Sequence, residues 1–140
     1  MELKERLALY RAQKKYERYP GIKSFKIVLD NELTANESSI IESIKKIDSS
    51  CDDRIALECE RFSMVDWAKE KLLPCLDYES EIIVNGIGGI ALYFDDIEVF
   101  LKHYYEESCT LDIIIINRNL RRCVAILEGE FFLEYFNKAV

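Results

Sequence analysis

The chain has 140 residues, of which 49% are hydrophobic and 32% charged, and these values predict one folded domain over residues 1–140 and argue against disorder. No stretch approaches the roughly 20 consecutive apolar residues of a membrane span, and the N-terminus has no apolar signal segment, so we expect a cytoplasmic protein without membrane contact. The net charge of −7 disfavours nucleic acid as a direct partner.

The first half of the chain predicts a helix, a strand and a second helix, over residues 2–18, 22–29 and about 34–47. In the first helix Leu3, Leu7 and Tyr10 recur at helical spacing, and the other side forms a basic, solvated face. Thr34 or Asn36 is placed to cap the second helix. Its apolar stripe consists of Ile40, Ile41, Ile44 and Ile47.

The middle of the chain predicts a strand or irregular segment over residues 51–62 and then a third helix. Ser63 followed by Asp66 resembles a capping box and predicts the start of that helix. Pro74 stands where the helix is expected to end. Its buried side would comprise Trp67, Leu72 and Leu73.

The remaining sequence predicts mainly strands. Runs of β-branched and aromatic residues at 81–84, 90–94, 113–116, 123–127 and 131–136 are separated by turns rich in Asn and Gly. Between the second and third runs, Asp95 or Asp96 caps a helix that ends near Glu107 and whose apolar side is Ile97, Phe100, Leu101 and Tyr104. We therefore expect an α+β fold, in which an antiparallel sheet with a C-terminal three-stranded meander packs against about four helices.

The cysteines are odd in number, form no CxxC pair and fit no usual zinc-ligand spacing. They are expected to be small buried hydrophobic residues in a reducing compartment. These residues are Cys51, Cys59, Cys75, Cys109 and Cys123. The sequence thus predicts neither a metal nor a cofactor.

Two stretches of the sequence could form a ligand site, but each also has a purely structural explanation. The loop with Gly86, Gly88 and Gly89 could cradle a phosphate, but a strand follows it where a phosphate site needs a helix, so a hairpin turn or bulge is favoured. Asp95, Asp96 and Glu98 could hold Mg²⁺, although acidic residues at a helix start also serve as caps. The lone His103 is expected to pair with a glutamate, because no nucleophile motif accompanies it.

Residues 51–107 hold fourteen Asp and Glu against five Lys and Arg, a net charge of −9, whereas residues 1–19 carry +3. A field of this sign favours a basic protein partner, and a merely solubilising surface is an equally good explanation of the charge alone. Aromatic side chains left exposed beside carboxylates would serve as anchors for such a partner.

The segments EIIVNGIGGIALYF, DDIEVFLKHYYEES, LDIIIINRNL and RRCVAILEGEFFLEYF follow one another between about residues 80 and 136. In this order they resemble the small acidic immunity proteins of bacterial polymorphic-toxin and contact-dependent growth inhibition systems, including SUKH-like proteins. The resemblance implies that the chain inhibits a toxin domain, often a basic nuclease, by tight non-covalent binding. It carries over no individual functional residue.

We therefore expect a non-enzymatic antitoxin, favoured as a monomer, that recognises its cognate toxin through the acidic middle of the chain. The candidate contact residues are Asp77, Tyr78, Glu79, Asp95, Asp96, Glu98, Tyr104, Tyr105, Glu106 and Glu107. One alternative is a small nucleotide- or metal-binding enzyme that uses residues 86–89 as a phosphate loop and Asp95 and Asp96 at a metal. The other is a structural adaptor whose apolar hairpin edge pairs with another chain.

Overall fold

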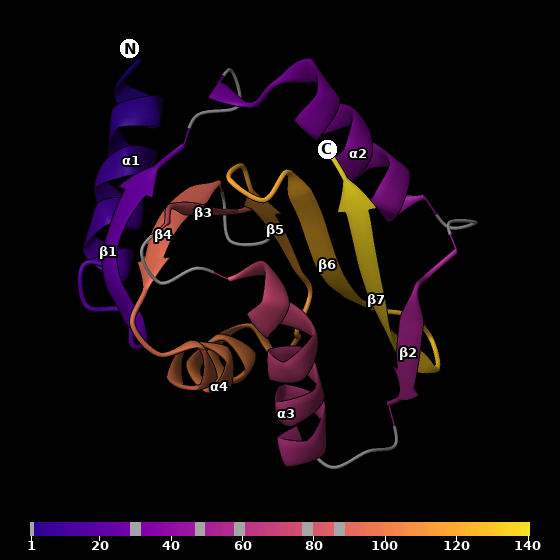
Figure 1. Ribbon diagram of the computed structural model, residues 1–140. Helices are drawn as coiled ribbons and strands as arrows, with labels where there is room; N and C mark the ends of the chain where they lie inside the picture. Colours follow the sequence, from indigo (N-terminus) through magenta and orange to yellow (C-terminus); the bar gives the residue numbers. More distant parts are fainter. Residues whose placement is uncertain (1, 29–31, 47–49, 58–60, 77–79, 86–88) are drawn as a thin grey trace.

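The computed structural model describes residues 2–28, 32–46, 50–57, 61–76, 80–85 and 89–140. These residues form four α-helices, one 3₁₀ turn and a seven-stranded antiparallel sheet, so the expected α+β fold is confirmed (Figure 1). The elements are α1 (Leu3–Tyr16), β1 (Ile22–Ile27), α2 (Ala35–Lys45), β2 (Asp53–Ala56), α3 (Arg61–Leu72), η2 (Leu73–Cys75), β3 (Ile82–Val84), β4 (Ile90–Phe94), α4 (Ile97–Ser108), β5 (Ile113–Asn117), β6 (Arg122–Glu128) and β7 (Phe132–Ala139).

The sheet has the strand order β1-β4-β3-β5-β6-β7-β2, and every neighbouring pair is antiparallel. The predicted C-terminal meander is present as β5, β6 and β7, with Ala125 opposite both Ile114 and Phe136. β2 adds to the outer side of β7, where Arg54 lies opposite Glu134. The strand from residues 53–56 thus covers part of the hairpin edge that the adaptor hypothesis requires, along Phe132–Tyr135 of β7.

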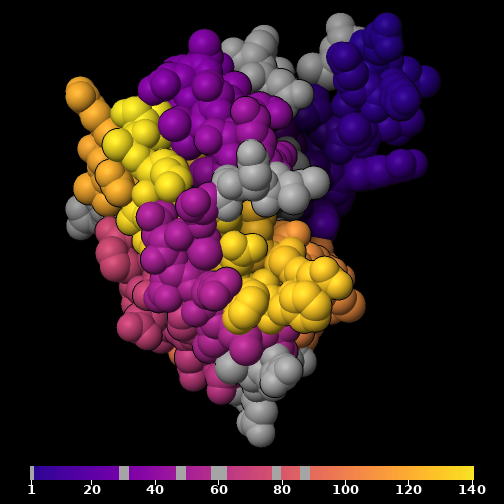
Figure 2. All heavy atoms as spheres, turned by 90° about the vertical axis from the view of Figure 1, so that its right-hand side faces the viewer, coloured from indigo at the N-terminus to yellow at the C-terminus, as the bar shows by residue number. Residues whose placement is uncertain are grey.

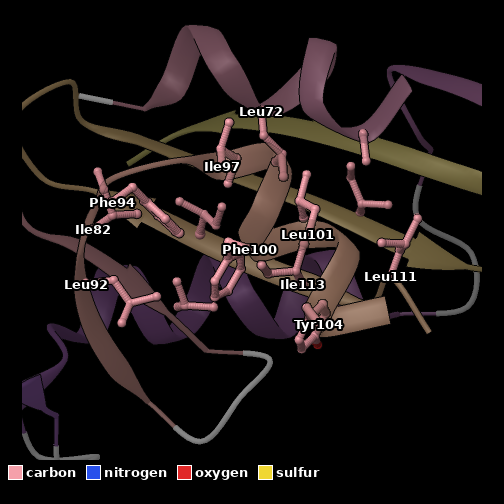
Figure 3. Packing of buried hydrophobic residues seen from close by; sticks show 14 of the residues in the cluster. Leu72, Ile82, Leu92, Phe94, Ile97, Phe100, Leu101, Tyr104, Leu111 and Ile113 are labelled. Atoms are coloured by element: carbon pink, nitrogen blue, oxygen red, sulfur yellow. The ribbon is translucent and has the colours of Figure 1, made fainter. Parts of the chain in front are cut away.

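Both faces of the sheet are buried. The face that carries Ile113 and Ile115 packs against α3, α4 and the end of α1, and the face that carries Ile114 and Ile116 packs against α2. Strands covered on both sides need apolar residues at every position, which explains the unbroken isoleucine run of β5. Figure 3 shows the larger core, where Leu72 of α3 and Leu101 of α4 lie beside the sheet.

Two of the predicted helix starts are confirmed by their hydrogen bonds. The Thr34 hydroxyl accepts from the backbone N–H of Glu37 (3.1 Å), and the Glu37 carboxylate accepts from the backbone N–H of Thr34 (2.9 Å), which forms a capping box on α2. Asp96 Oδ1 accepts from the backbone N–H groups of Glu98 (3.0 Å) and Val99 (3.2 Å) at the start of α4. These bonds satisfy donors that have no partner inside the helix.

The predicted start of α3 at Ser63 is wrong. The backbone is already helical at Arg61, so Ser63 lies in the first turn, where the spacing Ser-x-x-Asp places two side chains on one helical surface without capping it. Leu73 was expected on the buried side but is exposed, because the chain changes from α-helix to the 3₁₀ turn η2 at that residue. Pro74 lies in η2 and ends the helix as predicted.

The described cysteines differ in burial. Cys75 and Cys123 are buried as predicted, and burial raises the pKa of their thiols to about 11 and about 12. Cys51 is half-buried, whereas Cys109 is exposed at the C-terminal end of α4 with a φ of 59°. The prediction of burial is wrong for Cys109 because the chain turns outward there. Cys59 lies outside the described residues.

The paired strands β3 and β4 support the predicted hairpin, since Val84 lies opposite Ile90. Residues 86–88 of the connecting loop lie outside the described residues, and Gly89 has a φ of 71°. Within the described parts of the chain, every helix is too short or too polar to cross a bilayer.

Candidate protein-binding surface

Helix α4 carries most of the candidate contact residues, and the fold holds it in one orientation. Its inner side is fixed in the core by Ile97, Phe100, Leu101 and Tyr104 (Figure 3), the apolar stripe predicted from the sequence. At its N-terminal end, the Gly21 carbonyl accepts hydrogen bonds from the backbone N–H groups of Asp95 (2.8 Å) and Asp96 (3.0 Å). These bonds tie the start of α4 to the loop between α1 and β1.

The outer side of α4 alternates between charge and apolar surface. At 100° per residue, Val99, Lys102 and Glu106 fall on one stripe along the helix, and Asp95 directly precedes the N-cap residue Asp96. Val99 is 43% exposed, and Asp95 and Glu106 are exposed as well. We call this surface the α4 face, and it consists of Asp95, Asp96, Glu98, Val99, Lys102 and Glu106. It carries four carboxylates against one ammonium, a net charge of −3, around one exposed aliphatic side chain.

Glu98 is partly neutralised within the molecule. Its carboxylate lies 3.3 Å from Lys69 Nζ of α3 and 3.2 Å from Lys102 Nζ of α4. Lys102 and then Lys69 lower the pKa of Glu98, so this carboxylate keeps its charge well into the acidic range. A partner would meet Glu98 as part of a group of three charges, and Asp95 and Glu106 lie on either side of that group.

Glu107 joins two helices of the molecule. Its carboxylate lies 2.7 Å from Lys15 Nζ of α1 and 3.2 Å from His103 Nε2. Burial raises the pKa of Glu107, but hydrogen bonding to Lys15 and His103 outweighs this effect and lowers it. The expected pairing of His103 with a glutamate is confirmed, and its ring also meets Tyr19 edge-on at 4.6 Å between centroids. Glu107 therefore holds α1 against α4 and is not part of the α4 face.

Neither of the predicted aromatic anchors that the structure describes, Tyr104 and Tyr105, is fully exposed. Tyr104 is 3% exposed and its hydroxyl donates to the Asp112 carbonyl, while burial raises the pKa of the phenol to about 12. Its prediction as an exposed anchor is wrong, because it lies one turn beyond Phe100 and Leu101 on the buried side. Tyr105 is half-buried and packs against the same core. The other candidate residues, Asp77, Tyr78 and Glu79, lie outside the described residues.

A cavity of about 510 Å³ lies beside α4, between α1, β5 and the end of α2. The ion pair of Lys15 and Glu107 forms part of its wall, together with Tyr16, Asp112 and Lys45. Because two acids, Glu107 and Asp112, and two bases, Lys15 and Lys45, line the wall, the cavity has no strong field of one sign. Among the described residues, no group of three or more His, Cys, Asp or Glu side chains is arranged to hold a metal.

Sequence reasoning missed two features. The apolar residues of α1, Leu3, Leu7 and Tyr10, point to solvent although the pattern suggested an ordinary amphipathic helix. Arg118 makes two 2.9 Å hydrogen bonds to the buried carboxylate of Glu37, 81 positions away in the chain. No local pattern could have identified that pair, because neither side chain has a distinctive neighbour in sequence.

No protein-family model, no curated protein and no solved structure matches the chain.

Proposed function

We propose that this chain is an immunity protein, which binds a cognate toxin with a basic, nuclease-type domain and neutralises it by non-covalent occlusion. The observation that carries the proposal is the α4 face. There, one exposed aliphatic side chain, Val99, shares the outer side of α4 and its N-terminal end with the carboxylates of Asp95, Asp96, Glu98 and Glu106, and the helix is fixed at its N-terminal cap and along its buried side. The proposed role is binding, without catalysis by this chain.

The arrangement suits recognition of a cationic groove by a helix. A helix that is already ordered loses little conformational entropy on binding, so more of the contact energy appears as affinity. A nuclease groove that binds phosphates is positive, and its field attracts an acidic surface from a distance. Val99 supplies apolar contact at the centre, and the carboxylates around it set orientation and association rate.

The test is a charge reversal confined to the α4 face. The double variant Asp95→Lys, Glu106→Lys changes two exposed carboxylates and leaves the Asp96 cap and the Glu98 group intact. Glu42→Lys with Glu130→Lys is the matched control, because it makes the same change in net charge at exposed positions outside α4. The assay measures the association rate with a candidate nuclease-type toxin domain, chosen from the genes that neighbour the gene of this chain, together with rescue of growth on co-expression.

We expect the α4 variant to associate about 10-fold to 100-fold more slowly at low salt and to lose most of its salt dependence, whereas the control slows less than about 3-fold. If both variants associated equally slowly, net charge alone would explain the effect, and the α4 face would not be the binding surface. A toxin that binds neither the wild-type chain nor either variant would overturn the proposed function itself.

A further inference from the structure

Helix α1 exposes the apolar residues that its sequence pattern singled out. Leu3, Leu7 and Tyr10 are 66%, 46% and 59% exposed. Of the fourteen residues of α1, all of which the structure describes, only Tyr16 is buried. In Figure 2 the indigo atoms of α1 project from one corner of the molecule. An aliphatic and aromatic stripe on a projecting helix is surface that a partner can cover.

Cations border this stripe on both sides. At 100° per residue, Leu3, Leu7 and Tyr10 fall within about 60° of arc, with Arg6 on one side and Lys4 and Arg11 on the other. These three cations have no ion-pair partner among the described residues. We call this surface the α1 face, and it consists of Leu3, Lys4, Arg6, Leu7, Tyr10 and Arg11. Its partner must offer carboxylates around an apolar centre.

Among the described residues, the core contacts of α1 lie in its second half. Ala12 packs against the core, Tyr16 and the following Tyr19 are buried in it, and Lys15 pairs with Glu107. A helix of this length is marginal in water without tertiary contacts, so its first two turns gain stability from any surface that covers them. The α1 face is therefore an interaction surface.

We propose that the α1 face binds the α4 face of a second copy of this chain. Helix α1 holds five Lys or Arg and one Glu, a charge of +4, and since the whole chain has −7, the other residues carry −11. The α4 face offers what the α1 face needs, because Val99 is exposed and carboxylates surround it. An anionic membrane or a nucleic acid would also attract α1, and each would repel the acidic body just as a second copy does. The second copy is favoured because its α4 face presents carboxylates and an exposed aliphatic side chain together on an ordered helix.

Together with the proposed function, the contact between copies implies competition for the α4 face. If the toxin also binds the α4 face, toxin and second copy compete for one surface, and toxin binding separates the copies. Self-association itself is measured without any toxin, so its failure leaves the proposed function standing, and failure of toxin binding leaves self-association standing.

The test uses sedimentation velocity of the full chain over a range of protein concentrations. We expect the weight-average mass to rise above the 16.4 kDa of the monomer at about 0.05 M salt and to return to it at about 0.5 M, where exposed charges are screened. Arg6→Glu with Arg11→Glu, and separately Asp95→Lys with Glu106→Lys, should each abolish the rise. An equimolar mixture of the two variants should restore it, because each then supplies the charge that the other lacks.

The control is Lys23→Glu with Lys26→Glu, which removes two other exposed cations and should leave association intact. Far-ultraviolet circular dichroism checks that every variant remains folded. A wild-type chain that stays monomeric at low salt, or a mixture of variants that does not associate, overturns the proposal. Binding of the wild-type chain to vesicles containing phosphatidylglycerol, with loss of that binding in Arg6→Glu with Arg11→Glu and no self-association, would assign the α1 face to a membrane instead.

Discussion

Gly21 connects the two helices that carry the proposed binding surfaces, and replacing it with alanine tests how tightly they are held. Its φ is 84°, in the left-handed region, and its carbonyl accepts the two hydrogen bonds from the start of α4. A Cβ at this position would lie 2.5 Å from the backbone nitrogen of Phe100 and 2.8 Å from its Cβ, and would also contact the Asp96 carbonyl oxygen. None of these atoms is the end of a flexible side chain.

The expected loss of stability follows from two terms. An L-residue in the left-handed region costs about 1–2 kcal/mol, and forcing a methyl group into a packed site costs about 1–3 kcal/mol more. Gly21→Ala should therefore lower the free energy of unfolding by about 2–5 kcal/mol, a large part of the roughly 5–15 kcal/mol of a typical domain. Relief of the clash by displacement of α4 would also slow association with the toxin.

Urea unfolding followed by circular dichroism measures the effect, with Gly129→Ala as the matched control. At Gly129 an added Cβ would meet the end of the Glu134 side chain at 3.0 Å and the Phe132 carbonyl oxygen at 3.4 Å. That side chain can move, so the control should lose less than about 1 kcal/mol. If the two variants are equally stable, the loop at Gly21 does not constrain α4, and the argument for a pre-ordered α4 face fails.

Two further predictions concern groups far from that loop. The Arg118 guanidinium lowers the pKa of the Glu37 carboxyl group, which is 3% exposed. The stability that this carboxylate contributes is therefore complete above its unfolded pKa of 4.5, and it is lost as the pH falls through the lower pKa of the folded state. Glu37→Gln should thus be less stable than wild type by about 1–2 kcal/mol at neutral pH, and urea unfolding across acidic pH should show the difference closing; a constant difference would contradict the assignment. Cys109→Gly should raise the free energy of unfolding by about 0.5–1 kcal/mol because Cys109 has a φ of 59°, whereas Cys109→Ala, which keeps the Cβ, should show no such gain in the same assay.

The elements that the sequence predicted well are those decided by neighbouring residues. The β5 to β7 meander follows from runs of β-branched and aromatic residues with short polar turns between them. The starts of α2 and α4 follow from Thr34 and Asp96, whose side chains bond to N–H groups two or three positions ahead. The buried stripe of α4 follows from helical periodicity. In each case the deciding interaction spans at most a few residues.

The failures come from contacts between distant parts of the chain. Helical spacing groups Leu3, Leu7 and Tyr10 on one side, but whether that side is covered depends on where α1 lies relative to the sheet. Counting acidic residues between 51 and 107 located the negative charge, but it did not reveal that Lys69 and Lys15 lie beside Glu98 and Glu107. Helical periodicity correctly placed Tyr104 in the apolar stripe of α4. Its prediction as an exposed anchor was inconsistent with that placement.

The ion pairs of α4 bear directly on how binding would work. Because Lys69 and Lys102 compensate Glu98, and Lys15 compensates Glu107, the attraction of a cationic partner at contact distance depends mainly on the exposed Asp95 and Asp96 together with the exposed Val99. The −11 charge outside α1 acts over the longer distance at which a partner approaches, and salt weakens it first. Association and dissociation should therefore respond to different residues: charge reversals change the association rate, most strongly on the α4 face and less at distant positions, whereas Val99→Asp changes the dissociation rate. A surface that merely keeps the protein dissolved would show neither division.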